Sequence, residues 1–249
     1  MKARPLFRFF LGLAALLVVM TMVVIVSRKP ADKPAAQPPA AEVVHDVSGV
    51  LGSRQAAQLE VVNGAESVII HSEAMEGILY RASTTPGSRV EPVAEETGDV
   101  VRLSLKGAEI AGQATIHVFL NTTVKWNVKL AGGGLRQVVD FASGRLTSID
   151  VVAGVQELDV TLPKPEGTLP IRVAGVGRLT LHAPMGPPAQ LTLGTGCTVG
   201  EAKLDDQARQ NLTGGTVLAG QGFATATDKY TLQVDGGAAS VQLDRRPGP

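Results

Sequence analysis

Five glycines recur along this chain with a constant period, and this repeat restricts the possible folds more than any other feature. They are Gly112, Gly133, Gly154, Gly175 and Gly196, which corresponds to about 21 residues per period. A fixed period of this length is typical of chains that wind into stacked coils, in which each coil buries its apolar side against the next. The repeat predicts an architecture, whereas it predicts no reaction.

The residues that follow each glycine alternate between apolar and polar side chains. At four, six and eight residues after the glycine, thirteen of fifteen positions are apolar, and the exceptions are Gln137 and Gly200. Eight of the ten intervening positions are polar or charged. Alternation with a period of two indicates a strand with one buried face and one wet face. Because the alternation recurs with the period of the glycines, equivalent strands are predicted to lie side by side and parallel.

A second apolar strand leads into each glycine, although the segment 169–173 is displaced by one residue. This displacement predicts a β-bulge or a changed turn. Glycine suits the corner between the two strands because it accepts a positive φ and allows neighbouring coils to approach closely. Pro163 and Pro184, which are separated by one period of the repeat, mark the opposite corner as an outer turn rich in proline and glycine.

We therefore expect an all-β fold: a single-chain parallel β-solenoid, right-handed according to the crossover preference of parallel strands. A β-sandwich is the alternative. Similar spacings around Gly64 and Gly237 extend the pattern outwards and predict about eight or nine coils in chain order. In this interpretation residues 83–98 contain an insertion and residues 205–229 form the weakest coil. Arg245 and Arg246 are expected to form a charged stop at the end of the stack.

The N-terminus carries the second strong signal. Phe9–Val26 is a run of 18 residues without a charge, which as a helix would be about 27 Å long, close to the hydrocarbon thickness of a bilayer. No small-residue cleavage site follows it, so we predict an uncleaved transmembrane anchor at 9–26 and not a signal peptide. Residues 1–8 would then be cytoplasmic, 27–48 an Ala/Pro-rich tether, and 49–245 an extracytoplasmic β-solenoid domain.

Charge and cysteine content limit the possible partners. The whole chain has a net charge of zero, but residues 1–33 hold six Lys/Arg and one Asp, so the remainder carries a net charge of −5. A mildly acidic domain argues against nucleic acid, which requires a basic surface. Cys197 is the single cysteine, so no intrachain disulfide can form. We interpret it as a small buried residue in preference to a reactive or intermolecular thiol.

Histidines and acids are the candidates for a metal site, and their spacing argues against one. In the frame of the repeat, His71, His117 and His182 fall in different columns and coils, and His45 lies in the tether. The better candidate is the column of His117, Asp159 and Glu201. Its members would lie on alternate coils, about 9–10 Å apart, which is too far for one ion. We interpret them as a solvated strand face and expect no metal.

No catalytic constellation is recognised either. Polysaccharide hydrolysis uses acids clustered around the scissile bond, whereas Asp140 and His182 share a column two coils apart and are not expected to pair. Asp205-Asp206 could accept a cation but is interpreted as a polar turn. The glycine-rich segment 194–200 lacks the lysine and the helix of a phosphate-binding loop. We expect no catalytic residue and no cofactor.

Three segments resemble a known bacterial family. They are Val128–Gly134, Leu158–Gly167 and Val234–Val241. The family comprises membrane-anchored proteins with a DUF4097-type, adhesin-like β-solenoid domain, and it is related in pattern to the C-terminal domain of LiaF-type cell-envelope stress proteins. The resemblance covers residues 110–245, and the Leu-Pro-x-Pro-x-Gly turn at 162–167 is its most specific part. Val155 and Val176 replace the second glycine of the family's Gly-Gly turn. The resemblance implies an extracytoplasmic solenoid in a bacterial envelope, with no catalytic residues.

These features together predict a non-enzymatic, membrane-anchored protein whose solenoid presents an interaction surface to a protein or a cell-wall polymer. Its role would be adhesin-like or that of a partner in envelope stress sensing. One alternative is a polysaccharide-active β-helix enzyme of the cell envelope, which would show a deep groove lined by three or more acids or bases. A second alternative is a self-assembling scaffold whose ends stack into filaments.

Overall fold

The computed structural model describes residues 44–107 and 112–247. The anchor predicted at 9–26 and most of the predicted tether lie outside these residues. Within the described part of the chain, no helix is long and apolar enough to cross a bilayer. The first strand begins at Asp46, so the last three residues assigned to the tether by the sequence interpretation belong to the folded domain.

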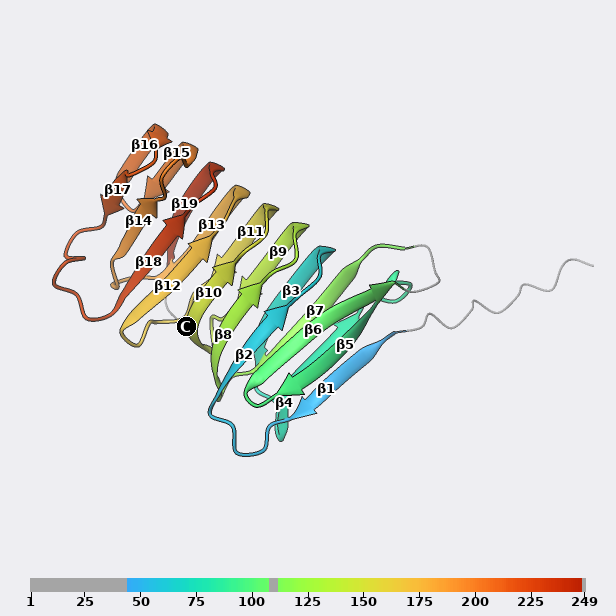
Figure 1. Ribbon diagram of the computed structural model, residues 1–249. Helices are drawn as coiled ribbons and strands as arrows, with labels where there is room; N and C mark the ends of the chain where they lie inside the picture. Colours follow the sequence, from blue (N-terminus) through green and yellow to red (C-terminus); the bar gives the residue numbers. More distant parts are fainter. Residues whose placement is uncertain (1–43, 108–111, 248–249) are drawn as a thin grey trace, which may run out of the picture. The chain divides into compact units, whose positions relative to one another are not determined.

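Two mixed β-sheets contain every strand of the described residues (Figure 1). Sheet A has ten strands in the order β1-β4-β7-β3-β9-β11-β13-β19-β15-β16, and sheet B has nine in the order β17-β14-β18-β12-β10-β8-β2-β6-β5. Their bounds are β1 Asp46–Val50, β2 Ala56–Val61, β3 Ala65–Glu73, β4 Ile78–Thr84, β5 Val90–Thr97, β6 Val100–Gly107, β7 Thr115–Asn121, β8 Lys125–Leu130, β9 Gly134–Asp140, β10 Arg145–Val151, β11 Val155–Thr161, β12 Thr168–Val173, β13 Val176–Pro184, β14 Ala189–Leu193, β15 Thr198–Leu204, β16 Gln207–Thr213, β17 Val217–Ala219, β18 Lys229–Val234 and β19 Ala238–Arg246.

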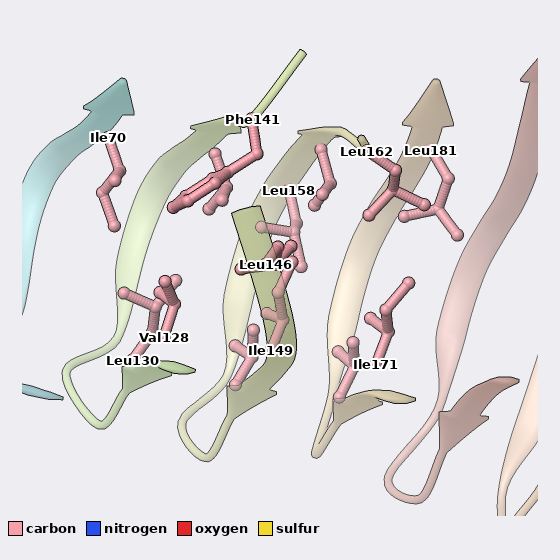
Figure 2. Packing of buried hydrophobic residues seen from close by; sticks show 14 of the residues in the cluster. Ile70, Val128, Leu130, Phe141, Leu146, Ile149, Leu158, Leu162, Ile171 and Leu181 are labelled. Atoms are coloured by element: carbon pink, nitrogen blue, oxygen red, sulfur yellow. The ribbon is translucent and has the colours of Figure 1, made fainter. Parts of the chain in front are cut away.

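The core is the space between the two sheets. In β8 the side chains of Trp126, Val128 and Leu130 are buried while the intervening residues face outwards, which is the alternation that the sequence predicts. Figure 2 shows the buried side chains of the two sheets, among them Ile149 and Leu158, filling this space. Each large aliphatic side chain buried there contributes about 1.5–3 kcal/mol of transfer free energy. The described domain therefore has a continuous core without a disulfide.

In the middle of the domain, each coil consists of one strand of sheet B followed by one strand of sheet A. The coils β8-β9, β10-β11 and β12-β13 are parallel neighbours. Val155 of β11 pairs with Gly134 of β9 on one side and with Val176 of β13 on the other, so both registers are offset by one period of the repeat. The parallel pairing predicted from the glycine repeat is confirmed for these strands.

The one-residue displacement near residue 170 comes from a changed turn. Ile149 of β10 pairs with Ile171 of β12 without a register shift, and this offset is one position longer than the period of the repeat. The connection from β12 to β13 contains two residues, whereas the connection from β10 to β11 contains three. The strands β11 and β13 therefore pair with an offset of one period of the repeat. A bulge does exist nearby, but it lies between Leu146 and Ser148 of β10, opposite β8.

At both ends of the domain the spatial order of coils differs from the chain order. The coil β2-β3 lies between β6-β7 and β8-β9, and the last coil, β18-β19, lies between β12-β13 and β14-β15 (Figure 1). The two sheets contain seven such two-stranded coils. The prediction of eight or nine coils stacked in chain order is therefore wrong. Glycine spacing counts residues along the chain, and it does not indicate which coil lies next in space.

Antiparallel strands cover both ends of the parallel stack. β4 pairs with β7 and β5 with β6 at one end, while β16 pairs with β15 and β17 with β14 at the other. The expected insertion at 83–98 and the expected weak coil at 205–229 correspond to these regions. Because both sheets are mixed, the prediction of an entirely parallel β-solenoid is wrong. The handedness of the coils stays a prediction.

The repeated glycines lie near connections between strands, but for different local reasons. Gly133, Gly154 and Gly175 end the connections from sheet B to sheet A, Gly196 lies between β14 and β15, and Gly112 precedes β7. Among these five, Gly196 alone has a positive φ, of 81°. At Gly112 a Cβ would overlap the carbonyl oxygen of Gly87, so close approach of two backbones requires glycine there. Pro163 lies between β11 and β12, and Pro184 ends β13.

Candidate interaction surface

The outer face of sheet B carries a row of charged side chains whose sign alternates from strand to strand. Glu60 of β2 accepts hydrogen bonds from Lys129 Nζ of β8 at 2.8 Å and from Arg102 Nη2 of β6 at 3.2 Å. Further along, Arg172 Nη1 of β12 lies 3.6 Å from Asp150 Oδ1 of β10. The complete row, called the charge ladder below, is Glu95, Arg102, Glu60, Lys129, Asp150 and Arg172.

The charge ladder exists because β2 is inserted between β6 and β8. Glu60 is only 12% exposed in its side chain, whereas its two cationic partners are 57% and 38% exposed. The hydrogen bond from Lys129 holds the pKa of Glu60 below its ordinary value; burial opposes this effect, and Arg102 adds to it. Exposed ion pairs contribute only about 0.2–1 kcal/mol each. The ladder therefore affects the charge pattern of the surface more than the stability of the fold.

Beside the charge ladder, the outward positions two residues earlier in the strands are uncharged and partly buried. Asn127 of β8 faces Gln58 of β2 and Ser148 of β10, and Thr231 of β18 lies between its register partners on β12 and β14. The members of this neutral row are Gln58, Asn127, Ser148, Pro170, Thr231 and Gln190. The Ser148 hydroxyl is buried and has no hydrogen-bond partner among the described residues. Sheet B thus presents amides and hydroxyls next to alternating charges.

A third feature borders this face where the strands of sheet B begin. Lys125 starts β8, Arg145 starts β10, and the two residues are register partners. Glu166, in the connection between β11 and β12, forms ion pairs with both of them. These residues line a cavity of about 160 Å³. The pKa of Glu166 is lowered by the hydrogen bond from Lys125 and then by that from Arg145, so the carboxylate is held in its ionised form.

The predicted column of His117, Asp159 and Glu201 is dispersed on sheet A. His117 is on β7 and Asp159 on β11, with β3 and β9 between them. Glu201 of β15 lies in a different row, since its register partner is Ser240 of β19, whereas the row of Asp159 continues to Gln242. No cluster of three or more metal-ligating side chains occurs among the described residues. These three side chains therefore form no common site. Their positions differ from the expected single column on alternate coils, because Glu201 lies in another row.

Two histidines that the repeat frame separates are neighbours in the structure. The rings of His71 and His117 stack with centroids 5.9 Å apart, and His71 also stacks on Phe119 at 5.4 Å. The guanidinium of Arg81 lies 4.6 Å from the centre of the Phe119 ring. The pKa of His117 is lowered by burial and, to a lesser extent, by His71. The cluster forms because β3 pairs with β7. The spacing of the two histidines in the sequence contained no signal for this pairing.

His182 has two acidic neighbours, contrary to the sequence interpretation. Its Nε2 lies 3.2 Å from Asp159 Oδ1 and its Nδ1 lies 3.8 Å from Asp244 Oδ2, while the residue itself is 8% exposed. Asp244 faces His182 because β19 is inserted beside β13. Asp140 is not paired with His182, as expected. The two carboxylates approach opposite ring nitrogens, although the buried Nδ1 has no hydrogen-bond partner among the described residues.

The remaining candidates have structural roles. Asp205 and Asp206 form the turn between β15 and β16, and the Asp205 carboxylate accepts hydrogen bonds from Arg245 Nε and Nη2 at 2.6 and 3.0 Å. Arg245 is thus tied to the domain, and it is not an exposed charged stop. Cys197 is buried, as predicted, and burial raises the pKa of its thiol. The segment 194–200 connects β14 to β15 and enters that strand.

Comparison with known proteins identifies a similar fold. No family model matches the chain, and no curated protein matches its sequence. A solved structure of a putative cell adhesion protein from Clostridium sporogenes ATCC 15579 is similar, with a TM-score of 0.62 and 14% identity over 82% of this chain and 99% of that chain. A putative adhesin from Bacteroides fragilis NCTC 9343 matches with a TM-score of 0.30 and 10% identity, covering 82% of this chain and 98% of that one. Only the first similarity supports a structural conclusion, which is a shared fold.

Proposed function

We propose that this chain is a non-enzymatic, adhesin-like envelope protein that is anchored in a bacterial membrane by residues 9–26. In this proposal a right-handed β-solenoid displays the outer face of sheet B outside the cytoplasm. The observation that carries the proposal is the charge ladder with the neutral row beside it, which together form one polar face across neighbouring strands. The name of the Clostridium sporogenes neighbour, a putative cell adhesion protein, also supports an adhesin-like role.

The polar face of sheet B suits recognition of an extended partner. Neighbouring strands lie about 4.8 Å apart, so charges of one sign recur about every 9–10 Å along the ladder. The strands hold these side chains on a rigid backbone, and binding to a pre-organised surface loses less conformational entropy than binding to a mobile loop. An extended polymer or peptide with polar groups along its length could therefore contact several strands at once.

The cavity at Lys125 and Arg145 is lined by four charged residues, a number that the enzyme alternative requires, but the chemistry of these residues gives that alternative little support. Hydrolysis of a glycosidic bond requires a general acid with a raised pKa near a second carboxylate. In the cavity at Lys125 and Arg145 the lining contains one carboxylate, Glu166, and its pKa is lowered. A carboxylate that stays ionised cannot donate the proton that the leaving group needs. The cavity is therefore better suited to binding than to acid catalysis.

Filament formation through the ends of the domain is also disfavoured. The edge strand β5 contains Pro92, which lacks a backbone N–H, and several glutamates, whose like charges oppose the approach of a second copy. At the other end, the edge strand β17 has only three residues. Short, charged or proline-containing edges are the usual protection against edge-to-edge pairing. The two edges of sheet B therefore resemble caps.

The proposal can be tested by binding of the tagged full chain to isolated bacterial envelopes. A double variant, Arg102→Ser with Arg172→Ser, removes two cations of the charge ladder. The matched control, Arg136→Ser with Arg178→Ser, removes two cations from the outer face of sheet A. We expect saturable binding that the ladder variant loses and the control retains, with unchanged circular dichroism in both. Equal loss in both variants, or no saturable binding of the unaltered chain, contradicts the proposal.

A further inference from the structure

The connection from β11 to β12, residues 162–167, forms one wall of the cavity at Lys125 and Arg145, where β8 and β10 of sheet B begin. The cavity encloses about 160 Å³, and its charged lining consists of Lys125, Arg145, Lys164 and Glu166. Three cations face one carboxylate, so the lining carries a net charge of +2 in a domain that is acidic as a whole. A local excess of positive charge in a concave site attracts anions.

One carboxylate already lies between two of these cations. Lys125 Nζ lies 3.1 Å and Arg145 Nη2 lies 3.2 Å from the same oxygen, Oε2 of Glu166. Arg145 Nη2 also lies 3.4 Å from the second oxygen, Oε1. The two cations are therefore spaced so that a single carboxylate satisfies both. The Glu166 side chain is 67% exposed, so it can move away into solvent at little cost.

The lining has further binding capacity beyond the two ion pairs. Lys164 forms no ion pair with any acid in the described part of the chain. Thr147 donates its hydroxyl to the Trp126 carbonyl at 2.8 Å, which leaves the oxygen of that hydroxyl free to accept a hydrogen bond. Thr168 lines the cavity as well. A ligand that carries both an anionic group and hydroxyls would find partners for each.

The wall that carries Lys164 and Glu166 is held in place by the inserted strand β18. The Tyr230 hydroxyl donates to the carbonyl of Pro163 at 2.8 Å, and Tyr230 is itself buried. Asp228 accepts a hydrogen bond from the backbone N–H of Gly167 at 2.8 Å. The connection is thus fixed at both ends. A site whose backbone is fixed before binding loses little entropy when the ligand arrives.

We propose that Lys125, Arg145 and Lys164 form a binding site for the carboxylate of an acidic sugar, and that Glu166 occupies this site as an internal competitor when no ligand is bound. The cavity is smaller than the roughly 300–1,000 Å³ of pockets for drug-sized ligands, which suits one sugar unit of a longer polymer. The inference rests on the proposed function, because it names the chemistry of the partner that the neighbouring polar face would bind.

The test uses the full chain, purified in a neutral detergent, and three immobilised polymers. Polygalacturonate offers carboxylates, polyphosphate offers phosphates, and dextran offers hydroxyls alone. We expect binding to polygalacturonate that weakens as salt rises, since screening reduces attraction between exposed charges, and weaker or no binding to the other two. Equal or tighter binding to polyphosphate or dextran overturns the assignment to a carboxylate.

Variants of the lining give effects of opposite sign. Glu166→Gln removes the competitor and is expected to tighten polygalacturonate binding by about threefold or more, while Arg145→Gln and Lys164→Gln weaken it by a similar factor. Glu157→Gln and Arg178→Gln, on the outer face of sheet A, make the same changes in net charge and should leave the affinity unchanged. Equal gains for Glu157→Gln and Glu166→Gln would reveal a general charge effect and overturn the proposal.

The outcomes also separate this inference from the proposed function. If the ladder variant abolishes envelope binding while the five cavity and control variants bind polygalacturonate equally, the inference fails and the proposed function stands. If the cavity variants behave as expected but the unaltered chain shows no saturable binding to envelopes, the carboxylate site stands and the adhesin-like function fails.

Discussion

In the middle of the domain, β8 to β13, strands that follow one another in the chain lie on consecutive coils, whereas at both ends the chain crosses over one coil. At the N-terminal end β6-β7 and β8-β9 lie on opposite sides of the earlier coil β2-β3, and at the C-terminal end β18-β19 fills the gap between β12-β13 and β14-β15. The middle coils are joined by backbone pairing between neighbours in the sequence. The inserted coils β2-β3 and β18-β19 instead have partners from distant parts of the chain on both sides.

This difference shows how the domain avoids loose ends. In a simple stack the last coil has one neighbour and can fray, because each repeat contacts only the repeats beside it. Here the C-terminal coil has neighbours on both sides. Two of its side chains also form hydrogen bonds with distant residues: Tyr230 with Pro163, 67 positions earlier, and Arg245 with Asp205, 40 positions earlier. The outermost coils are covered in turn by antiparallel strands.

The largest effect is expected from removal of the inserted C-terminal coil. Truncation after Thr227 deletes β18 and β19, which exposes backbone groups of β12, β13, β14 and β15 together. We expect loss of the cooperative thermal unfolding transition, measured by circular dichroism. Removal of residues 247–249 alone is the control, since every strand remains. A truncated chain that unfolds cooperatively with a small decrease in Tm would indicate that the last coil behaves as an ordinary terminal repeat.

Core truncations should cost the same in the inserted coil as in the middle. Leu232 of β18 and Ile149 of β10 are both fully buried. Replacing either with alanine should lower the free energy of unfolding by about 2–5 kcal/mol, because transfer and cavity terms add. Denaturant unfolding of the two variants provides the comparison. A cost at Leu232 well below that at Ile149 would mean that the inserted coil is packed more loosely than the middle of the domain.

The buried hydroxyl of Tyr230 should have a smaller effect. Tyr230→Phe leaves the Pro163 carbonyl without its donor, which should lower the free energy of unfolding by about 1–2 kcal/mol. Tyr80→Phe at the opposite end is the matched variant, since that hydroxyl donates to Glu96 at 3.3 Å in a less buried position. We expect the smaller loss for Tyr80→Phe. The reverse order in denaturant unfolding would contradict the importance of the contact between β18 and the 162–167 connection.

The smallest expected effect is a pH dependence at Glu60. Because the pKa of Glu60 is lowered in the folded protein, chiefly by Lys129, its contribution to stability is present above the ordinary pKa of 4.5 and is lost as the pH falls through the folded value. Glu60→Gln should therefore flatten the loss of Tm on acidification below about pH 4.5. Glu157→Gln serves as the control on sheet A. Identical acid profiles for Glu60→Gln and the unaltered chain would exclude this contribution.

The middle of the fold could be predicted from particular residues. The alternation around Val139 and Val160 indicates strands, and the offset of one period indicates which residues pair, as Leu158 and Leu179 do. These inferences succeeded because side-chain direction along a strand depends on local backbone geometry, which repeats with the sequence.

The candidate surface could not be predicted in the same way. The ladder requires Glu60 to lie between Arg102 and Lys129, which are 42 and 69 residues further along the chain. The neighbour of His182, Asp244, is separated from it by more than two periods of the repeat. A frame that places each coil beside the next one in the chain assigns these residues to coils that are not neighbours. The cavity at Glu166 similarly requires Tyr230 from the inserted strand β18 and Asp228, which directly precedes that strand.

By itself, the sequence determined the strand pattern, the buried columns and the register of the middle coils, because these depend on the alternation of side chains within each strand. Only the tertiary structure decided which coil lies beside which at the two ends, and with it the charge ladder and the wall of the carboxylate site. The physical reason is that the free energy of closing a longer loop rises only slowly with its length, so a chain can bypass a coil at little cost and return to pair both of its exposed edges.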